Sequence, residues 1–68
     1  MSTQIQVNGR EEPLTVATVA ELLQARGIEG ARGVAVAVNG VVVPAGAWRE
    51  LSLAGGDRIE IVRPFGGG

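Results

Sequence analysis

The residues best suited to take part in a reaction lie at the end of the sequence, where Phe65 is followed by Gly66, Gly67 and Gly68. Because glycine has no side chain, such a run can pass its backbone through a passage too narrow for other residues. The α-carboxylate of Gly68 is ionised at neutral pH and is a poor acylating group unless another molecule activates it. An enzyme that uses ATP can supply this activation by forming an acyl-adenylate. The ending therefore predicts a carboxyl group that a partner loads.

A frayed chain end is the alternative interpretation, since terminal residues are often poorly ordered and glycine loses the most entropy when it is fixed. The preceding residues favour a functional tail, because Pro64 stiffens its root and residues 64–68 extend roughly 16 Å when fully stretched. A large aromatic residue in a solvent-exposed tail also indicates a pocket on a partner that receives it. We expect a folded domain of residues 1–63 and a flexible tail of residues 64–68. Within the tail, Phe65, Gly66 and Gly67 would thread into partner active sites, and Gly68 would be modified.

Composition leaves the chain few means to catalyse a reaction of its own. Its 68 residues include neither Cys nor His, which removes disulfides, soft-metal sites, thiol nucleophiles and imidazole bases. All six basic residues are Arg, so the chain has no Lys amine that could attack its own activated carboxyl group. A coding bias toward Arg explains the missing Lys equally well. We expect no intrinsic catalytic residue, no metal and no cofactor bound by the chain.

Charge and hydropathy narrow the choice of partners. Six Arg oppose seven acidic residues and the two signs are scattered, so no cationic face indicates nucleic acid or anionic lipid. Residues 1–6 carry neither a basic start nor an apolar run, and no stretch approaches the roughly 20 apolar residues that span a bilayer. We expect a cytoplasmic protein that is monomeric when free and that binds other proteins, not nucleic acid or membranes.

Two hairpins are predicted by the same dipeptide, which is Asn8-Gly9 in one and Asn39-Gly40 in the other. This pair readily adopts the positive φ angles of a two-residue turn. Alternating residues flank both turns, and the strands they predict are residues 4–7 and 10–14 in the first hairpin and residues 34–38 and 41–43 in the second. A further alternating stretch predicts a last strand at residues 58–62. Before it, Trp48 lies in an irregular stretch and is expected to plug the edge of the sheet.

Between the hairpins the sequence predicts a helix of about two turns at residues 19–26. Thr18 and Glu21 have the spacing at which a hydroxyl and a carboxylate satisfy free N–H groups at a helix start. Gly27 suits the left-handed position that ends a helix, and Ile28 can then fold back onto it. The order of hairpin, helix, hairpin and strand is that of the α+β class with a β-grasp, or ubiquitin-like, fold. Its mixed sheet of four to five strands would pack on one short helix.

The face of the sheet without helix cover is a candidate docking surface. If the isoleucines of the last strand point to the helix, alternation turns Val62 to the open face. Ala35, Ala37 and Val43 are expected beside it. Soluble monomers rarely expose an apolar patch without a use. A different register would instead place Val43 in the core, and we retain Val43 and Val62 as predicted docking residues.

Several segments together resemble one family. They are Thr18-Val19-Ala20-Glu21-Leu22-Leu23, Ala37-Val38-Asn39-Gly40 with Val43-Pro44, Trp48, Gly56-Asp57-Arg58-Ile59-Glu60-Ile61 and the terminal Gly67-Gly68. Each segment alone is weakly specific, whereas their order, the compact length and the ending together are more specific. On these residues the chain resembles the sulfur carrier proteins of thiamine biosynthesis, the ThiS family, from residue 5 to residue 68.

The resemblance implies that an E1-like adenylating enzyme of the ThiF type activates Gly68 with ATP, and that the carboxyl group becomes a thiocarboxylate. Sulfur would come from cysteine through a persulfide on a donor such as a cysteine desulfurase, and thiazole synthase of the ThiG type would receive it. Gly66 and the preceding Phe65 depart from the usual family ending. Three alternatives stay open: a carrier like the small subunit of molybdopterin synthase, a non-catalytic ubiquitin-like protein-binding module, and a tag that is conjugated to a lysine amine.

Overall fold

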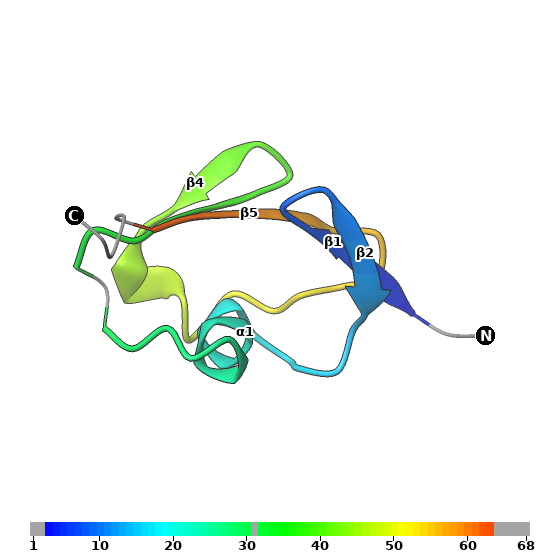
Figure 1. Cartoon of the computed structure of the whole chain (residues 1–68), viewed down its shortest axis with the longest axis horizontal. Helices are drawn as coiled ribbons and strands as arrows, with labels where there is room; N and C mark the ends of the chain where they lie inside the picture. Colours follow the sequence, from blue (N-terminus) through cyan, green and yellow to red (C-terminus); the bar gives the residue numbers. More distant parts are fainter. Residues whose placement is uncertain (1–2, 31, 64–68) are drawn as a thin grey trace.

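The computed structural model describes residues 3–30 and 32–63. In order, the elements of this part are β1 (Gln4–Val7), β2 (Arg10–Pro13), α1 (Val19–Ala25), β3 (Ala35–Val38), β4 (Val41–Val43), the 3-10 helix η1 (Ala45–Ala47) and β5 (Arg58–Val62). The strands form a mixed sheet in the order β2-β1-β5-β3-β4. Helix α1 lies against one face of this sheet, and no helix of the described residues lies over the other face (Figure 1).

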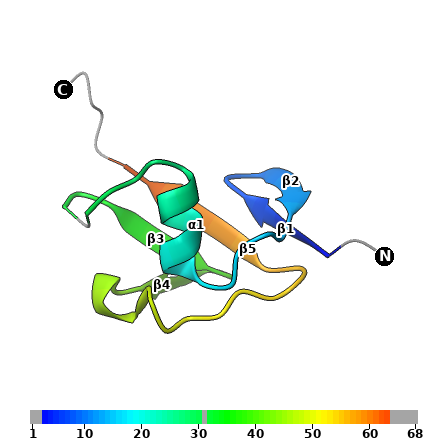
Figure 2. The same cartoon turned by 90° about the horizontal axis from the view of Figure 1, so that it is seen from below.

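Strand β5 occupies the centre of the sheet and joins the two hairpins. It runs parallel to β1, where Val7 pairs with Ile59, and antiparallel to β3, where Val38 pairs with the same Ile59. Seen from the helix side, α1 lies over the middle of the sheet, with β1 and β2 on one flank and β3 and β4 on the other (Figure 2). The predicted β-grasp arrangement is confirmed.

Local residues set the ends of α1 much as the sequence predicts. The Thr18 hydroxyl oxygen accepts a hydrogen bond from the Glu21 N–H at 3.2 Å, and the Glu21 carboxylate accepts one from the Ala17 N–H at 2.8 Å. At the other end Gly27 has a φ of 77°, and the Ile28 N–H donates to the Leu23 carbonyl at 3.0 Å. This is the Schellman ending, which satisfies carbonyls that the last turn leaves free. The helix ends at Ala25, one residue before the predicted end.

The strands follow the predicted ranges closely. β1, β4 and β5 have the predicted bounds, whereas β2 ends at Pro13 and β3 begins at Ala35, each one residue shorter than predicted. One backbone hydrogen bond still follows Pro13, since the Leu14 N–H donates to the Thr3 carbonyl at 2.9 Å. Gly33, with a φ of 74°, bends the chain shortly before β3 and accounts for the later start of that strand.

The core lies between α1 and the face of the sheet that α1 covers. Its buried hydrophobic residues are Ile5, Val7, Val19, Leu22, Leu23, Ile28, Val36, Val43, Trp48, Leu53, Ile59 and Ile61. Each strand except β2 contributes at least one of these side chains, and α1 contributes three. Burial of this apolar surface is the main source of stability in so small a domain.

Trp48 closes the core beside β4, as the sequence predicts. Its side chain is buried at the end of η1, and the indole Nε1–H donates to the Val43 carbonyl oxygen at 2.9 Å. The ring therefore fills space under the sheet while its one polar group is satisfied. This contact fixes the segment after Pro44 to the edge strand β4.

Candidate functional site

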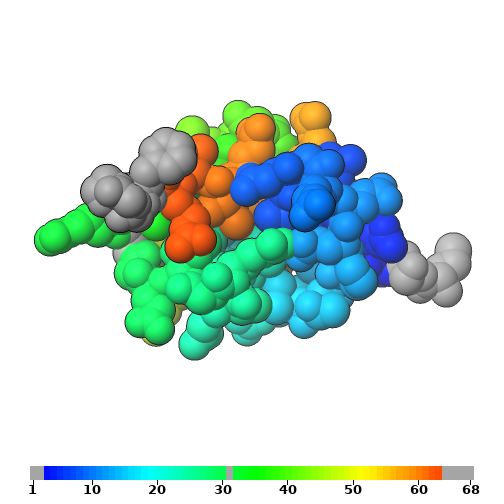
Figure 3. Space-filling model, in the orientation of Figure 1, coloured from blue at the N-terminus to red at the C-terminus, as the bar shows by residue number. Residues whose placement is uncertain are grey.

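The candidate site begins where β5 reaches the surface. The side chains of β5 alternate, with Ile59 and Ile61 buried and Val62 63% exposed. In the space-filling view the last residues of β5, drawn orange to red, reach the surface between the β1–β2 hairpin and the segment after α1 (Figure 3). Arg63 is the last described residue of the strand's continuation. The predicted tail residues Phe65, Gly66, Gly67 and Gly68 lie outside the described residues.

Two asparagine side chains hold the backbone of β5 from opposite ends. At the start of the strand, the Arg58 N–H donates to Asn39 Oδ1 at 3.0 Å. Near its end, the Ile61 N–H donates to Asn8 Oδ1 at 2.8 Å, and Asn8 Nδ2 donates to the Ile61 carbonyl at 3.3 Å. Both asparagines are the first residues of the two hairpin turns, with φ angles of 52° and 53°. Sequence reasoning recognised them as turn residues and missed these contacts.

The open face of the sheet carries an apolar patch beside the end of β5. Cross-strand pairing sets Ala35 beside Val62 and Ala37 beside Val42, so that their side chains share one face. We call these four residues the open-face patch. Val42 is 72% exposed, and Val62 is 63% exposed. The predicted placement of Val62, Ala35 and Ala37 on this face is confirmed.

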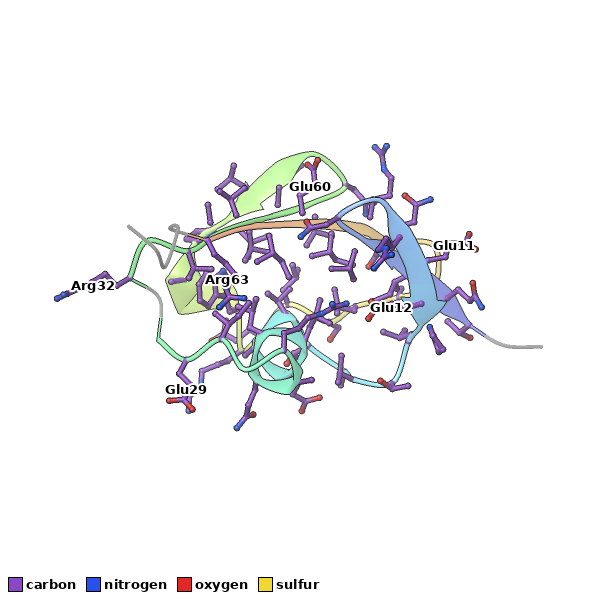
Figure 4. The ribbon with its side chains drawn as sticks, in the orientation of Figure 1. Glu11, Glu12, Glu29, Arg32, Glu60 and Arg63 are labelled. Carbon is purple, nitrogen blue, oxygen red and sulfur yellow. The ribbon has the colours of Figure 1, made fainter. Side chains whose placement is uncertain are left out.

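Polar side chains share the open face with the patch, and on β5 they are Arg58 and Glu60. Glu60 pairs with Ala37 across β3 and β5 and lines the same shallow depression as Asn8, Val42 and Val62. In Figure 4 the Glu60 side chain lies on the side of the sheet away from α1, whereas Arg63 lies on the α1 side. Near the end of β5, the open face therefore presents apolar side chains and the Glu60 carboxylate. The face toward α1 presents the Arg63 guanidinium.

The predicted placement of Val43 on the open face is wrong. Val43 is only 8% exposed and belongs to the core, because it pairs with Val36, whose side chain faces α1. In a two-residue hairpin, the residues that follow the turn mirror those that precede it. Val42 therefore takes the exposed position beside Ala37, and Val43 lies on the face that α1 covers.

Other polar groups of the described residues serve the fold. The Asp57 carboxylate accepts hydrogen bonds from the Ala54 N–H at 2.8 Å and from Asn39 Nδ2 at 3.1 Å, which closes the turn before β5. Arg26 and Glu12 form a surface ion pair. Within residues 3–30 and 32–63, no three His, Cys, Asp or Glu side chains are grouped to hold a metal ion. No helix in these ranges has the length and apolar character needed to cross a membrane.

In the part of the chain that the structure describes, two hairpins, the helix α1 and the central strand β5 form a sheet with no helix over one face. This arrangement defines a ubiquitin-like β-grasp protein. The sequence pattern of the ThiS family matches residues 3–68. The chain belongs to the ThiS family.

A solved structure supports the same assignment. The crystal structure of the thiamine biosynthesis protein ThiS from Geobacter metallireducens is similar to this chain, with a TM-score of 0.76 and 32% sequence identity. The match covers 96% of this chain and 99% of the Geobacter chain. A comparison with the curated proteins gives no match.

Proposed function

We propose that this protein is a sulfur carrier of thiamine biosynthesis, in which the carboxyl group of Gly68 carries the sulfur as a thiocarboxylate. The single observation that carries the proposal is the ThiS family match, which extends to residue 68 and so includes the terminal glycines. The similar protein from Geobacter is described as a thiamine biosynthesis protein. The chain itself is a co-substrate, and its partners perform the catalysis.

The first chemical step activates the carboxylate outside this chain. An E1-like adenylating enzyme of the ThiF type uses ATP, one carboxylate oxygen attacks the α-phosphorus, and pyrophosphate leaves. The product is a mixed anhydride with AMP, whose acyl carbon accepts nucleophiles that the free carboxylate would repel. Threading of Phe65, Gly66 and Gly67 into the partner brings Gly68 to the ATP.

The second step exchanges oxygen for sulfur. The terminal sulfur of a persulfide, formed on a donor such as a cysteine desulfurase, attacks the acyl carbon, and AMP leaves. A second thiol then attacks the donor's cysteine sulfur in the acyl disulfide and breaks the S–S bond. This thiol and the donor cysteine form a disulfide, and the carrier leaves as a thiocarboxylate. Thiazole synthase of the ThiG type receives this sulfur, and the thiocarboxylate sulfur is the nucleophile in that transfer.

Docking through the open-face patch would orient the tail toward the partner's active site. Val42 and Val62 are large exposed hydrophobic residues, and Val62 directly precedes the last described residue. An apolar partner surface with one cation opposite Glu60 would complement this face, since unpaired charges that lose water weaken an interface. β5 lies in the centre of the sheet and ends at Val62, next to Arg63, the last described residue.

The experiment measures pyrophosphate release from ATP by the cognate adenylating enzyme. The full chain should stimulate release, whereas a chain without Gly68 should not, because its last carboxyl group falls one residue short of the ATP. Binding to the enzyme should change little, since the folded domain is intact. Equal stimulation by both chains would contradict the proposal and favour a protein-binding module. Transfer of the activated chain to a lysine amine would indicate a conjugating tag. Transfer of its sulfur to molybdopterin synthase alone would indicate the carrier of that pathway.

A further inference from the structure

The edge of β5 that faces β1 loses its strand partner before β5 ends. The Gln6 N–H donates to the Asp57 carbonyl at 3.0 Å, and the Asn8 N–H donates to the Ile59 carbonyl at 2.9 Å. In a continuing parallel ladder, the Asn8 carbonyl would next accept the Ile61 N–H. The chain instead turns away at Asn8, which has a φ of 52°. The backbone of β1 therefore cannot reach the last part of β5.

The Asn8 side chain takes over the missing pairing. Its Oδ1 accepts the Ile61 N–H at 2.8 Å, and its Nδ2 donates to the Ile61 carbonyl at 3.3 Å. One carboxamide thus satisfies the two Ile61 backbone groups that a continued β1 would have paired through the Asn8 carbonyl and through the N–H two residues further on. On the other edge, β3 pairs with β5 as far as Val62. With Asn8 in place, both edges of β5 are held up to the point where the chain leaves the sheet.

We infer that Asn8 is a positioning residue for the sulfur-carrying tail, an inference that rests on the proposed function. By holding Ile61, seven residues before Gly68, it fixes the direction in which the chain leaves the sheet. Without the Asn8 side chain, the N–H and carbonyl of Ile61 would hydrogen-bond to water. The end of β5 would then pair only with β3. A smaller fraction of molecules would then present the tail in the direction that the adenylating enzyme accepts. The apparent affinity falls by that fraction, while the bound complex reacts as before.

Asn39 provides a matched control at the opposite end of the same strand. It starts the other two-residue turn with nearly the same φ, and its carboxamide also makes two hydrogen bonds, to the Arg58 N–H and to Asp57. The variants Asn8→Gly and Asn39→Gly both keep a residue that tolerates positive φ, and each loses two side-chain hydrogen bonds. They should therefore lower stability to a similar extent. Only Asn8→Gly loosens the end of β5 from which the tail leaves.

The experiment determines kcat and KM of the adenylating enzyme for each carrier variant, together with amide hydrogen exchange of the free carriers. We expect KM for Asn8→Gly to rise about three- to tenfold, the effect of freeing roughly one backbone residue, with kcat within about twofold of the wild type. Asn39→Gly should keep KM within about twofold. The Ile61 amide should exchange faster in Asn8→Gly only, and the Arg58 amide faster in Asn39→Gly only.

Each result has a defined meaning. Equal KM values for the two variants, or an unchanged Ile61 exchange rate in Asn8→Gly, would overturn the inference. If the wild-type carrier fails to stimulate the enzyme, the proposed function fails, while the exchange rates still test whether Asn8 holds the end of β5. Should Asn8→Gly not fold, Asn8→Asp replaces it, because aspartate keeps the acceptor for the Ile61 N–H and loses the donor. That variant should raise KM above the wild-type value by less than tenfold, and a wild-type KM would again contradict the inference.

Discussion

The two faces of the sheet use neighbouring residues of the same strands for different purposes. On the face toward α1, Ile59 is 1% exposed and Val43 is 8% exposed. On the open face, Val62, three residues after Ile59, is 63% exposed, and Val42, the residue before Val43, is 72% exposed. The hydrophobic residues on the covered face therefore stabilise the fold, whereas those on the open face contribute little to it and remain available to a partner. Paired substitutions, one on each face, test this difference directly.

The largest effect on stability is expected from Ile59→Ala, with Val62→Ala as its counterpart on the open face. Ile59 is among the largest fully buried side chains, and its truncation should lower the free energy of unfolding by about 3–4 kcal/mol. Val62→Ala should change it by less than about 0.5 kcal/mol. Urea denaturation followed by Trp48 fluorescence measures both values. Comparable losses in the two variants would show that the open face is also part of the core.

A smaller effect is expected from Val43→Ala, with its neighbour Val42→Ala as the control. Loss of the buried Val43 methyl groups should lower the free energy of unfolding by about 2 kcal/mol. The exposed Val42 should tolerate the change within about 0.5 kcal/mol. Binding to the adenylating enzyme should be weakened more by Val42→Ala than by Val43→Ala, since only Val42 belongs to the open-face patch. A weakened complex with Val43→Ala at full carrier folding would restore a docking role for Val43.

The capping hydroxyl of α1 should matter less than either buried valine or isoleucine. Thr18→Ala removes the acceptor for the Glu21 N–H and should lower the free energy of unfolding by about 1 kcal/mol. Thr15→Ala, at an exposed position before the helix, serves as the control and should be nearly neutral. The same denaturation experiment compares the two. Equal effects would mean that the Thr18 hydrogen bond does not stabilise the helix in solution.

The smallest effect on stability and a clear effect on binding are expected for Val62→Asp. A carboxylate in the open-face patch should weaken the complex with the adenylating enzyme by about tenfold or more, because it must lose water at an apolar contact. Val41→Asp is the control, since Val41 is 66% exposed but pairs with Val38, away from the patch. Isothermal titration calorimetry gives both affinities. If Val41→Asp weakens binding as much as Val62→Asp, net charge rather than the patch determines the affinity.

Local chemistry explains how much of the fold could be predicted from the sequence. The Asn-Gly turns, the Thr18 and Glu21 pair and the Gly27 ending each act over a few residues, and the structure contains all of them. Strand alternation also predicted which side chains of β5 are buried. These features need no knowledge of distant neighbours.

Features that depend on pairing between strands were predicted less well. Alternation holds within one strand, but the side on which Val43 lies depends on how the turn pairs it with Val36. A strict two-residue turn would have given the observed register. The contact between Asn8 and Ile61 joins residues 53 positions apart, so no local pattern indicates it. The role of Gly68 stays a prediction, since its support is the family match.

Mass spectrometry of the carrier after loading tests the central claim most directly. The full chain is incubated with ATP, the cognate adenylating enzyme and a persulfide donor, and its intact mass and C-terminal fragments are measured. The account predicts a mass gain equal to the difference between sulfur and oxygen, confined to fragments that contain Gly68 and absent without ATP. An unchanged mass under conditions in which the enzyme loads its known carrier, or a gain on fragments within residues 1–63, would contradict it.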